Sequence, residues 1–396
     1  MSSSSSTQHA LPFRSALPAV LFVTSIFFCN FLSRVMFAPL MPVIQDEMGF
    51  THAGAGQLFL ALGIGNGVGL LLSGFISREV DHRRTVAISS ILVGICVLIV
   101  TQTTGYGSLM GAMLALGMAV GLYLPSGMAT LTSLVRNKDW GKSIAVHELA
   151  PNVAYVTAPL LAESLLLIAG WKGAFYLLGG AQIVLGLLFL RRGKGGEFPG
   201  MVPGPLMVAQ ILRRPIFWLL MTFFAMAVGA SIGPYSMLPL YLVDAHGFTR
   251  EEANKLLAAS RIMACFMPFL AGWITDKWGA KPAILLYLVT NGVSLILLGV
   301  ANGSLLVSLV VMQPVFSVLL FAPGFTVLAS AFPPEHRSVA IALMGPLNAT
   351  IGMGLVPTFL GYMGDAGMFG AGFMVQGAIL LITILFLPIL PKGRAK

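Results

Sequence analysis

Charged side chains are scarce in this chain. Asp, Glu, Lys and Arg together make up 9% of its 396 residues, whereas soluble domains carry roughly 25%. Hydrophobic residues make up 57%. A soluble fold cannot bury that much apolar surface, so the composition predicts that lipid surrounds most of the chain.

Cysteine is also scarce, and the chain lacks the patterns that usually indicate catalysis. Cys29, Cys96 and Cys265 fall in apolar segments without the spacing of a metal site, so we expect small buried apolar side chains and no disulfide. The glycine runs lack the lysine of a phosphate-binding loop. With no metal-ligand cluster and no nucleophile–base set, the sequence predicts neither an enzyme, nor a metal site, nor a cofactor.

Long apolar segments recur along the chain. Backbone polar groups in lipid must be satisfied within the segment, so these are predicted to be helices. Internal prolines predict kinks in several of them, at Pro125, Pro151, Pro159, Pro314 and Pro346. The predicted spans lie at about 17–43, 53–77, 85–103, 107–134, 143–168, 171–190, 216–242, 253–275, 283–301, 304–332, 338–363 and 367–390.

Lysine and arginine predict the orientation of these spans. Of 23 basic residues, Lys172, Arg250 and Lys255 fall at one end of the spans and Arg34 and Arg261 fall within spans, which leaves 18 at the other end. Basic residues favour the cytoplasmic side, so both termini are predicted to be cytoplasmic. This distribution explains the net charge of +9 without a nucleic-acid partner. The start, MSSSSSTQHALPF, lacks a cationic signal-peptide region and is expected to be a disordered tail.

An internal repeat predicts two similar halves. Gly49-Phe50-Thr51 recurs as Gly247-Phe248-Thr249, and 23 residues separate each threonine from Gly74 or Gly272, where we expect a short charged loop to begin. The longest polar connection is basic and rich in Gly and Pro, which is typical of a linker. The predicted organisation is a tail at 1–15, a six-helix bundle at 16–190, a cytoplasmic linker at 191–215, a second bundle at 216–390 and a tail at 391–396.

At these loops the sequence resembles the major facilitator superfamily of secondary carriers. The second loop matches that family's G-x-x-x-D-[RK]-x-G-x-[RK] motif at Gly272, Asp276, Lys277, Gly279 and Lys281. The first loop departs from it, because Arg78-Glu79 stands where an acid is followed by a base, and Asp81 replaces the glycine. The resemblance extends over essentially the whole chain. It implies an all-α membrane protein of about twelve helices in two pseudo-symmetric six-helix bundles.

The first and fifth spans are similar to the branches that carry organophosphates and organic acids. The segments are SRVMFAPLMPVIQDEMGF and AVHELAPNVAYVTAPLLAE. In those branches an arginine of the first helix binds the anionic group, and Arg34 takes that place. Pro151 stands where organophosphate carriers have a histidine, and Ser231 lies near the position of their second arginine. The resemblance therefore implies a small organic anion, a carboxylate rather than an organophosphate, and a monomer in a bacterial inner membrane.

Four of the ionisable residues within predicted spans stand out as candidates for function. Arg34 and Arg261 lie at similar depth, one in each half, and could clamp an anion between two planar guanidinium groups. The alternative is that each pairs with a carbonyl or a resident carboxylate. His147 and Glu148 could carry a coupling proton. The alternative is a gate, with Glu148 bridging to bases such as Arg78 or Lys142.

Uncharged polar residues in the spans are candidate hydrogen-bonding partners of a substrate. Asn152 and Asn348 occupy similar depths in the fifth and eleventh spans. Hydrogen bonding between helices is the alternative for each residue. The candidates are Asn30, Tyr123, Ser126, Asn152, Tyr155, Tyr235, Gln313 and Asn348.

Three functions follow as hypotheses. The first is a carrier that moves a small organic anion together with protons. The second is efflux or exchange of a neutral or zwitterionic metabolite, with the arginines serving as gates. The third is a non-transporting membrane sensor, which requires a soluble output domain that the sequence does not contain.

Overall fold

The computed structural model describes residues 10–391, and this part of the chain is helical without a strand. The helices of the first half are α1 (Phe13–Val35), α2 (Phe37–Met48), α3 (His52–Val80), α4 (His82–Gln102), α5 (Tyr106–Gly121), α6 (Tyr123–Leu134) and α7 (Trp140–Arg192), with a 3₁₀ turn at Asn137–Asp139. A short helix, α8 (Pro205–Leu212), lies in the predicted linker.

The helices of the second half are α9 (Pro215–Leu240), α10 (Arg250–Ala264), α11 (Met267–Trp278), α12 (Ala280–Val300), α13 (Gly303–Ser317), α14 (Phe321–Ala331), α15 (Pro334–Asn348), α16 (Val356–Asp365) and α17 (Phe369–Ile382). π-helical turns at Tyr241–Ala245 and Ala349–Leu355 and a 3₁₀ turn at Thr383–Ile389 complete them. The predicted tails at 1–15 and 391–396 lie largely outside the described residues, and α1 already begins at Phe13.

The described helices form 11 continuous segments that are long and apolar enough to cross a membrane. The longest, Asn137–Arg192, has 56 residues, and a straight helix of that length would span about 84 Å. It turns back on itself at Ala169 and Gly170, where the backbone leaves the helical region. The described residues therefore form twelve spans, and the predicted all-helical fold is confirmed.

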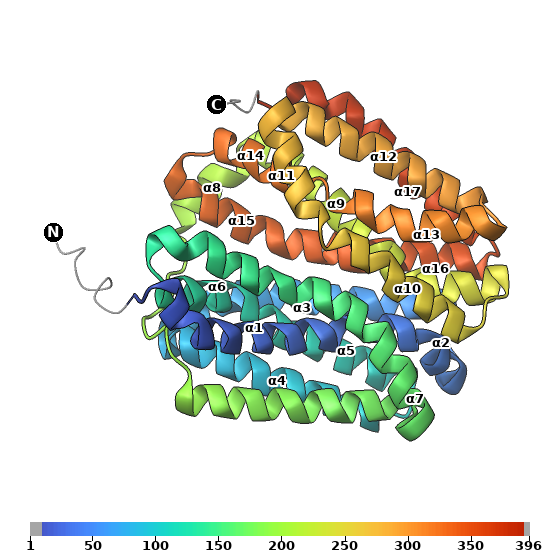
Figure 1. Ribbon diagram of the computed structural model, residues 1–396, viewed down its shortest axis with the longest axis horizontal. Coiled ribbons are helices and arrows are strands. Elements are labelled where there is room, and N and C mark those ends of the chain that lie inside the picture. Colours follow the sequence, from blue (N-terminus) through green and yellow to red (C-terminus); the bar gives the residue numbers. More distant parts are fainter. Residues whose placement is uncertain (1–9, 392–396) are drawn as a thin grey trace.

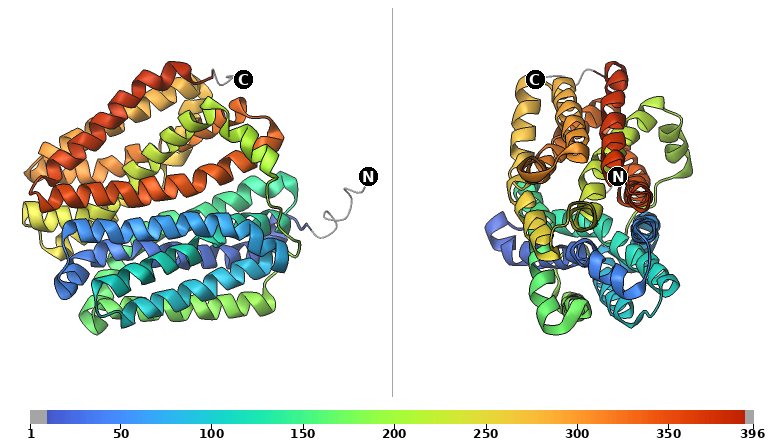
Figure 2. Two further views of the ribbon diagram at one scale, coloured as in Figure 1. Left: turned by 180° about the vertical axis from the view of Figure 1, so that it is seen from behind. Right: turned by 90° about the vertical axis from the view of Figure 1, so that its right-hand side faces the viewer.

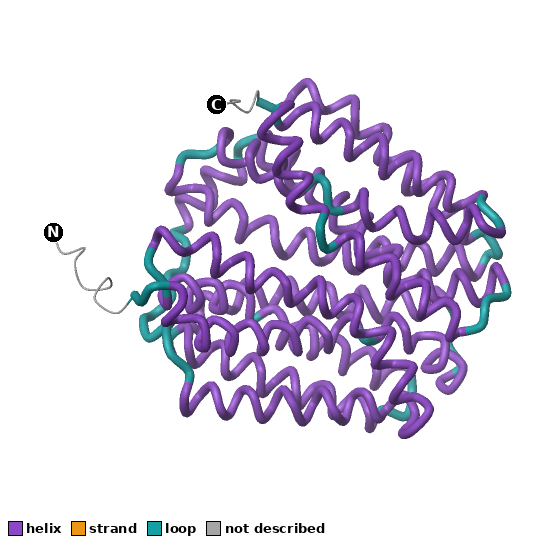
Figure 3. Tube along the Cα trace, viewed as in Figure 1, coloured by secondary structure: helices purple, strands orange, loops and turns teal. Residues whose placement is uncertain are grey.

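The helices lie side by side with the loops at their two ends (Figures 1 and 3). The helices up to residue 192 occupy the lower part of Figure 1 and those from residue 215 onward the upper part, and the view from behind agrees (Figure 2). These two groups are called the first and second halves below. The end near both chain termini is called the terminus end, and the end at the turn of Gly49 is called the far end.

The two turns that carry the family motif are shorter than predicted. The expected charged loops beginning at Gly74 and Gly272 are wrong, because α3 and α11 continue through both glycines. One residue makes each turn instead, Asp81 with φ 77° and Gly279 with φ 89°. Asp81 tolerates this left-handed conformation because its carboxylate accepts the backbone N–H of Arg84 at 2.8 Å and caps α4.

Proline explains where several spans are broken. Met36, Leu122 and Cys265 each interrupt a span, between α1 and α2, α5 and α6, and α10 and α11. A proline follows three residues after each, at Pro39, Pro125 and Pro268. The proline ring removes a backbone donor and crowds the carbonyl four residues earlier, so the regular helix ends there. Of the predicted kinks, Pro151 and Pro159 lie inside α7 without breaking it.

Glycines let α3 and α5 approach closely within the first half. A Cβ placed on Gly117 of α5 would collide with the Leu62 carbonyl oxygen and come within 2.9 Å of the Asn66 nitrogen. A Cβ on Gly111 of the same helix would meet nothing within 4 Å. The absence of a side chain is therefore required at Gly117 and not at Gly111.

We expect Gly117→Ala to lower the stability of the purified protein by about 1–3 kcal/mol, because the added methyl group forces two helix backbones apart. Gly111→Ala is the matched control and should melt at the wild-type temperature. Thermal unfolding in detergent measures both. Equal melting temperatures for the two variants would contradict the proposed packing.

Candidate substrate-binding site

Arg34 and Arg261 both lie in the last turn of a proline-terminated helix. Arg34 is in the last turn of α1 and Arg261 is in the last turn of α10. A helix C-terminus favours a nearby cation. The two helices belong to different halves. Arg34 lines a cavity together with Tyr155 and Tyr235, and Arg261 lies against the rings of the same two tyrosines.

The guanidinium of Arg261 lies against two tyrosine rings. Its Cζ is 4.3 Å from the ring centre of Tyr155 and 4.8 Å from that of Tyr235. Its Nη2 donates to the backbone carbonyl of Ser231 at 2.8 Å and its Nη1 to the Ser231 hydroxyl at 3.4 Å. The residue is only 4% exposed, and its Nε has no hydrogen-bond partner.

Arg34 likewise lies against uncharged side chains. Its Cζ lies 3.9 Å from the ring centre of Phe31, and its Nη1 contacts the Met353 sulfur at 3.9 Å. Its Nε is also buried without a partner. Met353 belongs to the second half, so this contact crosses between the halves.

Neither arginine is neutralised by an acidic side chain that the structure describes. The ion pairs of the described residues involve other bases. Aromatic faces offset part of the desolvation of a guanidinium, but they carry no net charge. One predicted alternative was a resident carboxylate, and the described contacts show none beside either arginine. The other was a backbone carbonyl, and Arg261 has such a partner in Ser231.

Two tyrosines fill the space between the halves. Tyr155 of α7 and Tyr235 of α9 have ring centres 4.6 Å apart, and the Tyr235 hydroxyl donates to the Tyr155 carbonyl at 3.5 Å. The cavity beside Arg34 is lined by both rings and has a volume of about 20 Å³. A cavity of that size holds about one water molecule.

His147 and Glu148 lie together near the terminus end, but in different surroundings. His147 is fully buried within the first half, with its ring stacked on Phe27 at 4.2 Å. Its Nε2 lies 3.1 Å from the Tyr123 hydroxyl, and its Nδ1 lies 3.3 Å from Glu148 Oε1. The Glu148 side chain is 53% exposed. In this arrangement Glu148 contacts neither Arg78 nor Lys142, which pair with Glu79 and Asp139.

The remaining polar candidates are dispersed. Gln313 lines a second cavity beside Arg261 and donates to the Ala230 carbonyl at 2.7 Å. Asn152 donates to the Glu148 carbonyl within its own helix. The side chains of Asn30 and Asn348 each have one buried polar atom without a partner. Ser126 contacts Ser73 and His82 instead of the central cavity.

The motif lysines make contacts of their own, and of the cysteines Cys265 lies next to the site, where its Sγ donates to the Arg261 carbonyl at 3.2 Å. Lys281 donates to the Pro388 carbonyl at 3.0 Å, and Lys277 lies over the Trp273 ring. All three cysteines are unpaired, and only Cys96 is fully buried, so the prediction of burial is wrong for Cys29 and Cys265, which are half-buried. No group of three potential metal ligands occurs among the described residues.

Sequence reasoning missed two neighbours of Arg34. Phe31 precedes Arg34 by three residues, which places both on one face of the helix and gives a usable signal. Met353 is 319 positions away, and no sequence pattern points to it. The repeat does not help, because the two arginines do not occupy equivalent positions in it.

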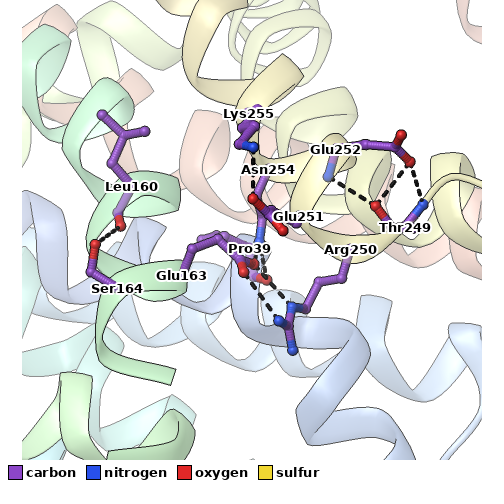
Figure 4. Close-up of polar contacts among 10 residues, drawn as sticks. All are labelled: Pro39, Leu160, Glu163, Ser164, Thr249, Arg250, Glu251, Glu252, Asn254 and Lys255. Atoms are coloured by element: carbon purple, nitrogen blue, oxygen red, sulfur yellow. Dashed lines mark hydrogen bonds and ion pairs between the residues drawn. The ribbon is translucent and has the colours of Figure 1, made fainter. Parts of the chain in front are cut away.

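A cluster of polar contacts joins the two halves at the far end (Figure 4). Arg250 donates two hydrogen bonds to Glu163, Nε to Oε1 at 2.9 Å and Nη2 to Oε2 at 3.1 Å. Asn254 donates to the same carboxylate at 2.6 Å and to the Pro39 carbonyl at 3.1 Å. Glu163 thus links α7 of the first half to α10 of the second.

A second far-end contact joins α3 to the second half. The carboxylate of Asp365 accepts the backbone N–H groups of His52 and Ala53 at 2.7 and 3.0 Å, at the positive end of α3. His52 Nε2 lies 3.5 Å from Asp244 Oδ2. Among the side chains that the structure describes, which leave out those of residues 334 and 335, no comparable hydrogen bond or ion pair joins the halves at the terminus end. The described ion pairs between the halves therefore lie at the far end.

Comparison with known proteins identifies the family. The model of the Major Facilitator Superfamily matches residues 23–267 and 254–396. The chain belongs to this superfamily. The predicted resemblance is thus confirmed, and the protein is an integral membrane transporter.

Relatives within the superfamily carry several kinds of substrate. The chain is 23% identical to a probable sulfoacetate transporter of Cupriavidus necator, covering 89% of both chains. It is 22% identical to a cis,cis-muconate transport protein of Acinetobacter baylyi, covering 86% of this chain and 85% of the relative. The solved structure of a D-xylose-proton symporter is 16% identical, covers 97% of this chain and 99% of that one, and has a TM-score of 0.76, which supports the fold.

We expect Glu163→Gln to loosen the far end, because it removes the charge that pairs with Arg250. Loss of this half-buried ion pair should destabilise the closed far end by about 1 kcal/mol, which corresponds to a roughly fivefold larger population with the far end open. The measurement uses Ser236→Cys, at the cavity beside Arg34, in a variant that lacks the three native cysteines. A membrane-impermeant maleimide is added at the far end, and the rate at which it labels this cysteine is recorded.

Glu251→Gln is the matched control for this experiment. Glu251 pairs with Lys255 on the exposed face of the same helix at 2.6 Å (Figure 4). Its loss should leave the labelling rate unchanged. If Glu163→Gln also labels at the wild-type rate, the Glu163–Arg250 pair does not hold the far end closed.

Proposed function

We propose that this transporter moves a small organic anion, with a carboxylate as the preferred group, across a bacterial inner membrane by alternating access. One observation carries the proposal: Arg34 lines a small cavity with Tyr155 and Tyr235, Arg261 of the other half lies against the same two rings, and no described acidic side chain neutralises either guanidinium. Such charges are unfavourable in a low-dielectric site unless an anion joins them. The names of the sulfoacetate and muconate relatives agree with an anionic cargo.

The buried Nε atoms of Arg34 and Arg261 support the same proposal. A buried donor without an acceptor costs about 1–3 kcal/mol. A carboxylate presents several acceptor sites in the planar geometry that suits a guanidinium. Cargo that reaches both arginines would therefore satisfy two donors that the protein itself leaves unsatisfied.

The cargo enters and leaves through alternate ends. The far end is fastened by Glu163–Arg250, and the described side chains make no polar contact between the halves at the terminus end, so this arrangement is suited to opening at the terminus end. The distribution of basic residues supports a cytoplasmic terminus end. The functional unit is proposed to be a monomer, since the site is built within one chain.

Coupling to protons is proposed to use His147 and Glu148. The Tyr123 hydroxyl must donate its one proton to the Val23 carbonyl, at 2.9 Å, so its contact with His147 Nε2 requires a proton on that nitrogen. The contact between His147 Nδ1 and Glu148 then needs a second proton, on the ring or on the carboxylate. The contacts with Tyr123 and between His147 and Glu148 are therefore all hydrogen bonds only when His147 and Glu148 together carry one proton in addition to that of a neutral imidazole.

Exchange of a neutral or zwitterionic metabolite is the second candidate, with the arginines serving as gates. The cross-half contact of Arg34 with Met353 favours it, since a gate residue must touch both halves. Under this alternative neutral substrates compete with anions at the site, whereas under the main proposal they do not.

We expect Arg34→Gln and Arg261→Gln each to reduce anion uptake by at least a hundredfold, because each removes a charge that pairs with the cargo and such losses amount to about 3 kcal/mol. The measurement is uptake of acetate, lactate, succinate, benzoate, sulfoacetate and cis,cis-muconate into proteoliposomes. Arg192→Gln, at an exposed position, is the control and should retain uptake. Intact uptake in both site variants would show that the arginines do not bind the cargo.

We expect His147→Gln to uncouple uptake from protons, because glutamine cannot bind the additional proton. Addition of the transported anion to lightly buffered wild-type proteoliposomes should raise the external pH, and the variant should give no such change. A wild-type pH response in the variant would assign the coupling proton to another group.

A further inference from the structure

We propose that Tyr155 is a positioning residue that holds Arg261 whenever the site contains no cargo, and thereby lets the unloaded carrier change sides. The inference rests on the proposed transport of an anion and adds a specific role for one aromatic ring. Three features of the site support it: the position of the ring across the halves, the volume that it fills and the charge that it faces.

The contact between Tyr155 and Arg261 crosses from one half to the other. Tyr155 belongs to α7 and Arg261 to α10, and the guanidinium lies 4.3 Å from the ring centre. Phe31, in the first half, packs edge-on against the same ring at 5.0 Å and fixes its orientation. A residue of the first half thus provides part of the environment of a cation of the second half.

The volume of the site excludes cargo while the rings are in place. The cavity lined by Arg34, Tyr155 and Tyr235 measures about 20 Å³, and the one beside Arg261 about 10 Å³. Neither exceeds the space of about one water molecule, and any organic anion is larger. Cargo can therefore reach the arginines only when the tyrosine rings move or the halves separate. Either movement breaks the contact between Tyr155 and Arg261.

The charge of Arg261 explains why the ring is needed. The residue is almost completely buried, and its described partners are the two tyrosine rings and Ser231. An aromatic face attracts a buried cation without adding a negative charge. A carboxylate in that place would neutralise the arginine permanently and compete with an anionic cargo. A ring stabilises the cation more weakly, so cargo can replace it.

This role affects one branch of the transport cycle more than the other. Exchange of internal for external anion needs only the loaded carrier to change sides. Net uptake also needs the unloaded carrier to return, with Arg261 buried between the halves and no anion beside it. Loss of the Tyr155 ring should therefore slow net uptake more than exchange.

The experiment compares net uptake and exchange in the same proteoliposomes, using the anion of the six named above that the wild type transports fastest. Tyr155→Leu removes the ring, and Tyr155→Phe keeps it without the hydroxyl. The ratio of net uptake to exchange should fall about two- to thirtyfold in Tyr155→Leu, the range that follows from the strength of a cation–π contact. It should stay within about twofold of wild type in Tyr155→Phe.

Tyr155→Met provides a second ring-free variant of similar length, for the case in which Tyr155→Leu does not fold, and thermal melting checks both. An equal fall in net uptake and exchange, or no fall in either, would overturn the role of the ring while leaving anion transport intact. Absence of both activities in the wild type for all six anions would instead overturn the proposed anionic cargo, and this inference with it.

Discussion

The burial of two guanidinium charges between the halves is the constraint on which the site depends. An arginine stays charged at any relevant pH, so burial cannot be relieved by loss of a proton. This chain places Arg34 and Arg261 in the last turns of proline-terminated helices and surrounds them with rings, a thioether, a hydroxyl and a backbone carbonyl. These groups make the burial tolerable and leave a net positive site.

The same contacts connect binding to motion. Arg34 reaches Met353 and Arg261 reaches Tyr155, so each arginine touches the opposite half through a weak partner. The far end, by contrast, is held by a bidentate ion pair and a capped helix end. Under the proposed function, cargo would therefore replace the weak central contacts before the stronger far-end contacts break. Loss of the central contacts would then shift the equilibrium between the arrangement described here and the proposed arrangement that opens to the other side.

Much of the fold could be predicted from the sequence, because the signals are physical and local. Apolar length predicts the spans, and the matched spacing from Thr51 to Gly74 and from Thr249 to Gly272 predicts the repeat. The one-residue turns were missed, since Asp81 in a left-handed conformation depends on its own side chain capping α4. The break near Met36 was also missed, although Pro39 signals it.

The site was predictable in part. Charge inside an apolar span indicated Arg34, Arg261 and His147, and the structure places the two arginines beside the same pair of tyrosines, Tyr155 and Tyr235. Asn152 was not brought there, because the position of a residue around its helix axis depends on packing that sequence depth does not reveal. Partners distant in sequence, such as Met353 and the Glu163–Arg250 pair, follow only from the way the two halves pack.

The most direct test of the central claim is a thermal-shift measurement on the purified protein with matched pairs of compounds, each carboxylate against its neutral amide of the same size. If the two arginines require an anionic counterpart, the acid of at least one pair should raise the melting temperature while its amide does not, and the shift should vanish when both arginines are replaced by glutamine. Equal stabilisation by an acid and its amide, retained in the double variant, would contradict the account.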